Sequence, residues 1–379
     1  MPTIKKALIV GAGIGGLTAA IALRRKGIEV EMVELNPEWS VYGVGIIQPN
    51  NMLRALDRIG LAQECVKVGA GFAGWRIHDK DGNHLMDARS TSAAAPLFPE
   101  NNGITRPRLH KILSDSALAT GATVTLGTTV DAIHEDEDGV HVTFPDGTSR
   151  NYDLVIGADG IYSRVRGMVF GEKYQPTFIG QAVWRYNLPR VSDVAWGELF
   201  FGPDSKVGLV PMSDREMYML LVTAEPGNPW MEKELLADKM RQRLAEYTGL
   251  IANLRELITD PAGVVYKPME TILMPAPWNK GRVLLIGDAA HAATPHLAQG
   301  AAMAIEDAVL LGDLLANDTP LQDALSDFMR RRFSRARFVY ESCNQISAWE
   351  QEEWRGEENP NAKPGELLHS AILELMNEY

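Results

Sequence analysis

Cysteine is scarce in this chain of 379 residues, which contains only Cys65 and Cys343. Two cysteines are too few for a disulfide framework or a cysteine-ligated metal cluster, so we predict no metal site and expect both thiols to be structural residues in a reducing, cytoplasmic environment. The chain also lacks the run of about 20 apolar residues that a membrane helix requires. Its first apolar segment, residues 7–10, leads directly into a glycine-rich turn and is therefore interpreted as a strand rather than a signal peptide.

Basic residues are in the minority as well. The chain has 37 Lys and Arg against 49 Asp and Glu, and its formal net charge is −12. With no basic stripe, it is expected to bind neither nucleic acid nor an anionic membrane. A hydrophobic content of 45% with 34 glycines and 21 prolines is typical of a globular enzyme. The length exceeds what one hydrophobic core usually serves, so the chain is expected to fold into two lobes. The protein is expected to be a monomer or a homodimer.

The most informative segment is an apolar strand at residues 7–10 that runs through glycines into a helix. Gly11 permits a tight turn, Gly13 lets the backbone approach a pyrophosphate, and Gly16 lets the helix pack closely on the strand. The phosphates of a bound dinucleotide would then meet the N-terminus of the helix. The cofactor-binding residues predicted in this turn are Gly11, Gly13, Ile14, Gly15 and Gly16.

A second predicted strand, residues 29–34, ends in an acid. Glu34 lies at the distance along the chain expected of a residue that binds a ribose hydroxyl. Strand, glycines, helix, strand and acid in this order indicate a dinucleotide-binding unit rather than a glycine-rich turn alone. Glu34 and the following Leu35 are predicted to contact the adenosine end of the cofactor.

Two further glycine motifs lie far down the chain, at residues 153–166 and 281–291. Each is a short apolar strand followed by a turn that presents one aspartate, Asp159 or Asp288. Both strands are expected in the same sheet as the first, so that three strand ends converge on one ligand, which suggests FAD rather than NAD. Taken singly, Asp159 is also compatible with a plain turn and Asp288 with a helix cap.

These three motifs, in this order over residues 5–340, resemble the class A flavoprotein monooxygenases, the family of 4-hydroxybenzoate, salicylate, 6-hydroxynicotinate and urate hydroxylases. The resemblance implies an α/β fold of the 4-hydroxybenzoate hydroxylase type, with a Rossmann-like FAD-binding domain, a β-sheet substrate domain and a helical C-terminal region. It also implies a single-component monooxygenase that uses FAD, NADH or NADPH, and dioxygen. Such an enzyme hydroxylates a small aromatic or N-heteroaromatic substrate, with or without decarboxylation, through a C4a-hydroperoxyflavin.

The resemblance also implies which residues contact the cofactor. The second motif of the family touches the pyrophosphate region and the pyridine nucleotide, the third binds the ribityl chain, and amides after a Gln-Gly step face the flavin pyrimidine edge. A helix N-terminus at that edge would stabilise negative charge on reduced flavin. In the family an arginine ahead of a helix contacts the cofactor; before the predicted helix at 108–119 the best match is Arg106, with Arg108 less favoured and a plain surface charge as the alternative for Arg106. The corresponding residues are Asp159, Gly160, Arg166, Gly287, Asp288, Pro295, Gly300, Ala301 and Ala302.

On the substrate side, Pro295 lies in the loop that the family places against the flavin, where its rigid ring would shape the oxygen pocket. His296 is either a proton shuttle or a residue behind the pocket or facing solvent. Arg185, beside Trp184 on a predicted strand, is expected to pair with a substrate carboxylate or oxyanion next to an aromatic wall, the alternative being an interdomain salt bridge. The 6-hydroxynicotinate hydroxylases carry a histidine where this chain has Ile47, so that catalytic histidine does not transfer.

Ile47 and Gln48 are still predicted to line the pocket, Gln48 as a hydrogen-bond partner, with plain packing as the alternative. The predicted catalytic residues are therefore Arg185, Pro295, His296 and Gln48. The predicted substrate-contacting residues are Ile47, Trp184, Pro211 and Tyr218.

The order of segments predicts a discontinuous FAD-binding domain from residues 1–72, 101–175 and 276–340. Residues 73–100 and 176–275 are assigned to the substrate domain, and 341–379 to a C-terminal tail. A basic amphipathic helix at 328–337 is interpreted as a solvated or interdomain face.

No second glycine-rich unit is present for a tightly held nicotinamide, which fits transient use of NAD(P)H. Two other classes of protein stay open. A halogenase would share the FAD motifs, but the Trp-x-Trp-x-Ile segment expected of it is absent. A flavin-binding ligand sensor would keep the glycines without hydroxylating.

Overall fold

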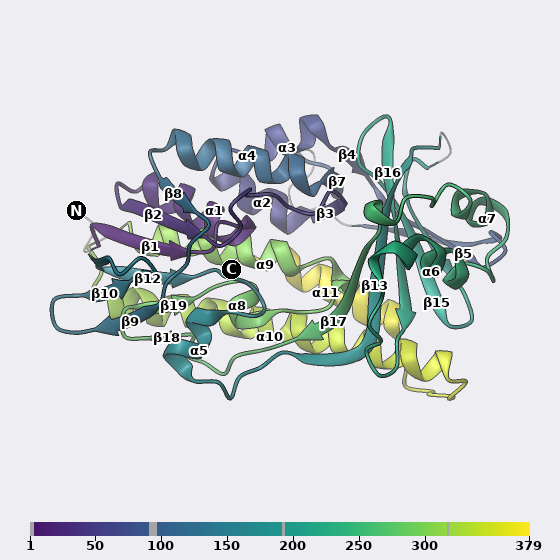
Figure 1. Cartoon of the computed structure of the whole chain (residues 1–379). Coiled ribbons are helices and arrows are strands. Elements are labelled where there is room, and N and C mark those ends of the chain that lie inside the picture. Colours follow the sequence, from purple (N-terminus) through teal and green to yellow (C-terminus); the bar gives the residue numbers. More distant parts are fainter. Residues whose placement is uncertain (1–3, 91–96, 192–193, 317) are drawn as a thin grey trace.

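A mostly parallel sheet lies in the half of the molecule that contains the N-terminus (Figure 1). The computed structural model describes residues 4–90, 97–191, 194–316 and 318–379. The strand order of this parallel sheet, β18-β19-β12-β1-β2-β8, places the strands of the three glycine motifs side by side. The strands are β18 (Asn279–Lys280), β19 (Val283–Leu285), β12 (Leu154–Gly157), β1 (Lys6–Val10), β2 (Glu29–Glu34) and β8 (Thr123–Leu126).

The register of this sheet brings the three motif turns to one edge. Strand β1 pairs in parallel with β2 and β12, and β12 pairs in parallel with β19. The ladder continues into the turns, because the Ala158 amide donates to the Val10 carbonyl at 2.8 Å and the Ile286 amide to the Gly157 carbonyl at 3.0 Å. The predicted convergence of three strand ends is therefore confirmed.

Helices pack on the parallel sheet around a large shared hydrophobic core. Helix α1 (Ile14–Arg24) is rich in alanine and leucine and is buried along most of its length. Helix α4 (Arg106–Ala119) begins at Thr105, whose hydroxyl accepts a hydrogen bond from the Arg108 amide. The other helices of this half are α2 (Asn50–Arg58), α3 (Ala62–Val68), α5 (Arg164–Phe170), α8 (Asp288–His291) and α9 (Gly300–Leu314).

The second half contains a seven-stranded sheet in the order β17-β13-β16-β15-β14-β5-β6 (Figure 1). One face of it packs on the short helices α6 (Leu236–Arg243) and α7 (Gly249–Arg255) around a core that includes Trp184 and Leu221. The other face carries the residues that alternate with these. The strands are β17 (Val265–Thr271), β13 (Thr177–Pro189), β16 (Glu216–Ala224), β15 (Ser205–Pro211), β14 (Gly197–Phe201), β5 (Gly74–Asp79) and β6 (His84–Arg89).

A small sheet, β3-β7-β4, joins the two halves. Its backbone approaches the seven-stranded sheet closely, since a Cβ on Gly103 would lie 1.9 Å from the Pro211 carbonyl oxygen. Its strands are β3 (Gly45–Pro49), β7 (Asn101–Thr105) and β4 (Ala70–Phe72), and a separate antiparallel sheet contains β9 (Ala132–Glu135), β10 (Val140–Thr143) and β11 (Ser149–Tyr152).

The long helix α10 (Leu321–Trp354) runs along both halves (Figure 1). It continues without a break through residue 340, where the sequence-based division placed the start of a tail, and α11 (Pro364–Met376) follows it. Its basic face also differs from expectation, because Arg332 and Arg335 are buried against carboxylates of α9. Among the helices of the described residues, none combines the length and the apolar character needed to cross a bilayer.

Candidate functional site

The turn between β1 and α1 has the geometry that its glycines predict. Gly11 has φ +100°, and a Cβ there would lie 2.5 Å from the Ala158 carbonyl oxygen. A Cβ on Gly16 would lie 1.9 Å from the Gly11 carbonyl oxygen, so the helix packs on the turn too closely for any side chain at position 16. By contrast, nothing lies within 4 Å of the equivalent position on Gly13. Because no side chain caps α1, its first amides face this open space and are available to a phosphate.

Glu34 is held at the end of β2, directly beside this turn. One carboxylate oxygen accepts a hydrogen bond from the Ala12 amide at 2.8 Å and the other from the Asn36 amide at 2.8 Å. Each oxygen has a further lone pair, so the carboxylate is fixed in place and still able to accept from a ribose hydroxyl. The next residue, Leu35, is largely exposed.

The second motif is built differently from its predicted role. The Asp159 carboxylate accepts from the Ser163 hydroxyl at 2.5 Å and from the Arg164 amide at 2.8 Å, so it caps α5, while Gly160 has φ +81° in the turn. Arg166 is buried, and its guanidinium donates to three carbonyls. These acceptors belong to Ile161, Tyr174 and Ala289. With every guanidinium nitrogen bonded, Arg166 supports helix α8 directly after Asp288 and is not free for the direct cofactor contact that the family resemblance implied.

In the third motif, Asp288 lies deep in the protein and yet reaches solvent. Burial raises the pKa of its carboxyl, although its side chain is exposed. A group that is surrounded by protein and also wet lines an internal hollow. Gly287, with φ +58°, donates its amide to Asp307 at 2.9 Å, and a Cβ on Gly300 would lie 4.0 Å from the Asp288 carboxylate. Asp288 therefore lies at the N-terminus of α9.

A buried polar network that the sequence reasoning missed holds the start of α9. The Asn51 amide donates to Gln299 at 2.9 Å and to Glu306 at 2.8 Å. Arg332 bridges Glu306 and Asp307, at 2.7 Å each. The available signal was a pair of acids inside the apolar helix α9 and arginines three residues apart in α10. The network fixes the Gln299-Gly300 step and leaves the amides of Gly300, Ala301 and Ala302 without a side-chain cap.

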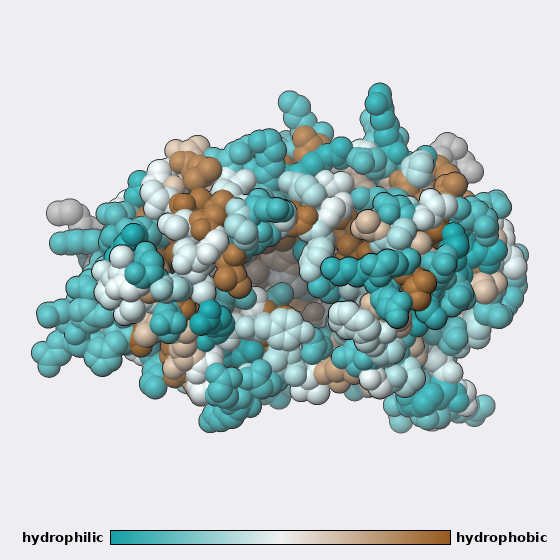
Figure 2. Space-filling model, in the orientation of Figure 1, coloured by the Kyte–Doolittle hydropathy of each residue, from teal (hydrophilic) through white to brown (hydrophobic). Residues whose placement is uncertain are grey.

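Two arginines that form no ion pair, Arg106 and Arg185, lie close enough for their charges to interact. Within the described residues, neither the Arg106 guanidinium nor that of Arg185 forms a hydrogen bond or an ion pair, although the Asp288 carboxylate is close enough to raise the pKa of Arg106 slightly against the effect of burial. Burial lowers the pKa of Arg106, and burial together with the charge of Arg106 lowers the pKa of Arg185 to about 10. Both side chains retain access to solvent. Figure 2 shows a hollow with apolar margins near the middle of the molecule, between its two halves. A buried unpaired cation is costly, so this arrangement favours an anionic ligand.

Strand alternation separates two residues that were predicted to act together. Trp184 is fully buried, donates its indole N–H to the Thr223 hydroxyl at 3.0 Å, and lies in the core against α6 and α7. Arg185 is the next residue on β13, so its side chain leaves the opposite face of the sheet. The expectation of a guanidinium beside a Trp184 wall is therefore wrong. Tyr218 takes that place: burial raises the pKa of its hydroxyl to about 12, and the nearby charges of Arg185 and Arg106 lower it in part.

Of the remaining residues predicted on the substrate side, one fits a pocket wall and two are buried in the packing. Ile47 packs with Tyr218 in an apolar cluster that also contains Phe72, and it fits a pocket wall. Gln48 is fully buried, and its amide oxygen accepts from Asn102 at 2.7 Å, so the packing alternative describes it better than contact with substrate. Pro211 is buried where β15 meets the small sheet.

The loop that carries Pro295 (η3, Pro295–Leu297) is anchored from behind by a buried ion network. Pro295 is exposed, whereas the His296 side chain is only 1% exposed, with its ring nitrogens 2.6 Å from the Thr294 hydroxyl and 3.0 Å from Glu350. Glu350 also pairs with Lys206 of β15. Burial, with the charge of Lys206, lowers the pKa of His296. His296 thus lies behind the pocket rather than in it.

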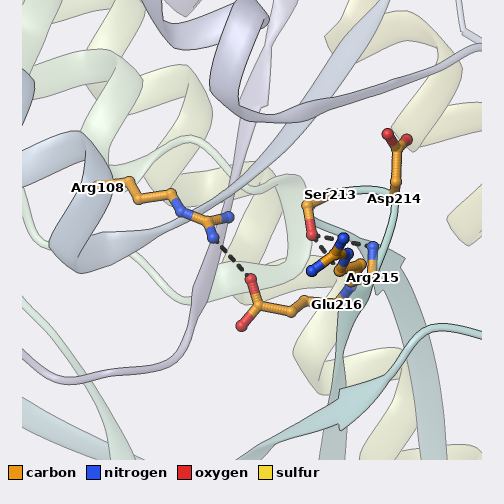
Figure 3. A pocket seen from close by; sticks show the side chains of 5 residues that line it. All are labelled: Arg108, Ser213, Asp214, Arg215 and Glu216. Carbon is orange, nitrogen blue, oxygen red and sulfur yellow. Dashed lines mark hydrogen bonds and ion pairs between the residues drawn. The ribbon is translucent and has the colours of Figure 1, made fainter.

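A separate surface pocket of about 490 Å³ lies where α4 meets the turn before β16 (Figure 3). Arg108 and Glu216 form an ion pair of 2.9 Å across it, and both are partly exposed. The other lining residues are Ser213, Asp214 and Arg215. Its Arg108 charge is paired and solvated, unlike the arginines of the hollow, so we place the candidate site in the hollow.

Comparisons with known proteins identify the family of the chain. Residues 5–329 match the family described as FAD binding domain. The chain is 32% identical over 349 residues to 2-heptyl-3-hydroxy-4(1H)-quinolone synthase of Pseudomonas aeruginosa, covering 90% of each protein. It belongs to the class A flavoprotein monooxygenases.

Other members of this monooxygenase family extend the likeness. Aurachin C monooxygenase/isomerase of Stigmatella aurantiaca is 30% identical over 365 residues, with coverage of 92% of this chain and 91% of that protein. The crystal structure of Klebsiella pneumoniae HpxO with FAD and uric acid superposes with a TM-score of 0.83 at 25% identity, over 99% of this chain and 98% of the other. The expected 4-hydroxybenzoate hydroxylase-like fold is confirmed, and FAD is the cofactor of the family.

Proposed function

We propose that this protein is an NAD(P)H-consuming FAD monooxygenase that hydroxylates a small anionic aromatic or N-heteroaromatic compound, with or without decarboxylation. The observation that carries the proposal is the pair of unpaired arginines, Arg106 and Arg185, in a hollow between a dinucleotide-binding edge and a sheet. A planar anion would supply the missing counter-charge to a guanidinium.

The residues at the dinucleotide-binding edge fit FAD. The open turn at Gly13 would hold the pyrophosphate, Glu34 the adenosine ribose, and Asp288 the ribityl chain. The uncapped amides at Gly300, Ala301 and Ala302 would face the pyrimidine edge and stabilise negative charge there. The chemistry that bound FAD supplies is activation of dioxygen after reduction by NAD(P)H. Arg106, between Asp288 and Tyr218, would stand at the junction of cofactor and substrate.

The substrate would lie against the face of the seven-stranded sheet that carries Arg185 and Tyr218. Arg185 would bind its carboxylate or ionised hydroxyl, and keeping an aromatic hydroxyl ionised favours attack on electrophilic oxygen. Ile47 and Pro295 would exclude water from the reacting atoms. The relatives support an N-heteroaromatic ring, since one is named for a quinolone and HpxO was crystallised with uric acid.

The experiment is an assay of NADH and NADPH consumption by the FAD-loaded protein with and without salicylate, 4-hydroxybenzoate, 6-hydroxynicotinate and urate. We expect at least one compound to accelerate consumption and to yield a product that has gained one oxygen atom, or that has gained one oxygen atom and lost carbon dioxide. Flavin binding without any effect of these compounds on consumption would instead favour a ligand sensor. Incorporation of halide into a product would favour a halogenase.

A further inference from the structure

Gly45 of β3 is the residue on which the Tyr218 ring rests. A Cβ on Gly45 would lie 2.1 Å and 2.5 Å from two ring carbons of Tyr218 and 2.5 Å from the Met212 sulfur. Ordinary contacts of this kind are 3.4–4 Å. The backbone of Gly45 is not left-handed, so glycine is not required there by conformation. It is required by the ring.

The ring has little room to move away from this contact. On its other sides it packs in the buried cluster that contains Ile47, Phe72, Val210 and Met212. Met212 is flexible and able to yield, whereas the aromatic ring is rigid and moves only as a unit. A side chain at position 45 would therefore displace Tyr218 itself.

Gly45 also lies next to Arg106, the other arginine of the hollow. It pairs with Thr105 of β7, and the amide of the following Arg106 donates to the Val44 carbonyl at 3.0 Å. Tyr218 lies on the sheet face that carries Arg185, because Asn187, two residues beyond Arg185 on β13, is its register partner. Within the described residues, the Tyr218 hydroxyl forms no hydrogen bond. One strand position thus sets the separation between Arg106 and the Tyr218 ring.

We propose that Gly45 is a positioning residue that sets substrate specificity, because its missing side chain seats Tyr218 at the distance from Arg106 that admits a flat aromatic anion. This inference rests on the proposed function for its substrate. A larger residue would displace the ring and change its separation from Arg106.

The test compares Gly45→Ala with Gly43→Ala in the FAD-loaded protein. Gly43 is a matched control, since nothing lies within 4 Å of its Cβ position and its backbone is not left-handed. In crystal structures we expect the Tyr218 ring to move away from residue 45 by about 1 Å or more in Gly45→Ala and to stay in place in Gly43→Ala. The reason is that the new Cβ of Gly45→Ala would otherwise lie 2.1 Å from a carbon of the ring. FAD affinity should stay unchanged in both.

Binding of the most effective of the four probe compounds, followed by perturbation of the flavin spectrum, should weaken by about 10-fold to 100-fold in Gly45→Ala, as expected for misplacement on this scale. In a Tyr218→Leu background, the same substitution should change binding by less than about twofold, because coupled residues lose their mutual effect when one is removed. Failure of Gly45→Ala to fold should likewise be rescued by Tyr218→Leu.

An unmoved ring, or an equal effect of Gly45→Ala with and without the ring, would overturn the inference. If the wild-type protein hydroxylates none of the probes, the proposed function fails, while the two crystal structures still decide whether Gly45 seats Tyr218. Weaker FAD binding in Gly45→Ala would also count against a role confined to substrate.

Discussion

Replacement of Arg185 by methionine should have two effects of opposite sign. The guanidinium is deep in the protein, its pKa is lowered to about 10 by burial and by Arg106, and no described residue neutralises it. Methionine fills a similar volume without a charge. The substitution should therefore weaken binding of an anionic aromatic compound and, in the absence of that compound, stabilise the fold.

The magnitudes follow from the kind of contact that is lost. A charge-assisted hydrogen bond contributes about 1.5–3 kcal/mol, so the affinity for salicylate or 6-hydroxynicotinate should fall roughly 10-fold to 100-fold. Removing an unpaired cation that still reaches solvent stabilises the fold less than removing a cation that is fully buried. We expect a gain of about 1 kcal/mol, or roughly 1 °C in Tm, for the FAD-loaded, substrate-free protein.

The assay is a flavin-spectrum titration together with a thermal melt. Arg215→Met serves as a control, because Arg215 is exposed on the same half of the molecule and should change neither quantity. A neutral analogue, salicylamide, should lose much less affinity than salicylate. Unchanged salicylate affinity together with a lower Tm would refute the reasoning and show that Arg185 has a structural partner.

Three further outcomes are expected. Asp288→Ala should weaken FAD retention with little change in the fold, measured by flavin released on dilution, whereas the exposed Asp214→Ala should not; equal retention would contradict the ribityl assignment. Arg332→Met should destabilise by about 3–5 kcal/mol in denaturant melts, because it removes the buried cation that bridges the Glu306 and Asp307 carboxylates of α9, while the exposed Arg330→Met should have little effect. Burial alone would raise the pKa of Glu350, but its lysine and histidine partners lower it to about 2. Its stabilising contribution should be complete above about pH 4.5 and lost as pH falls toward 2, and Glu350→Gln should flatten that part of the stability profile; an unaltered profile would contradict it.

The amino-acid sequence by itself determined the dinucleotide-binding edge. Gly11 and Gly16 reflect requirements within a few residues of chain, a tight turn and a close helix approach, and such local requirements are visible as residue types at fixed spacing. Asp288 could be assigned to the site for the same reason. The strand pattern also indicated a second sheet, because alternation with a period of two is a local property of the chain.

Only the tertiary structure decided which side chains face the hollow. Trp184 and Arg185 are neighbours in sequence, and the side of β13 that meets the cofactor half depends on how the two halves dock. Arg332 looked like part of a solvated helix face because its acidic partners lie in another helix. The contact of the Tyr218 ring with Gly45 joins two strands that are far apart in the chain. A long-range contact of this kind leaves no periodic signal in either segment.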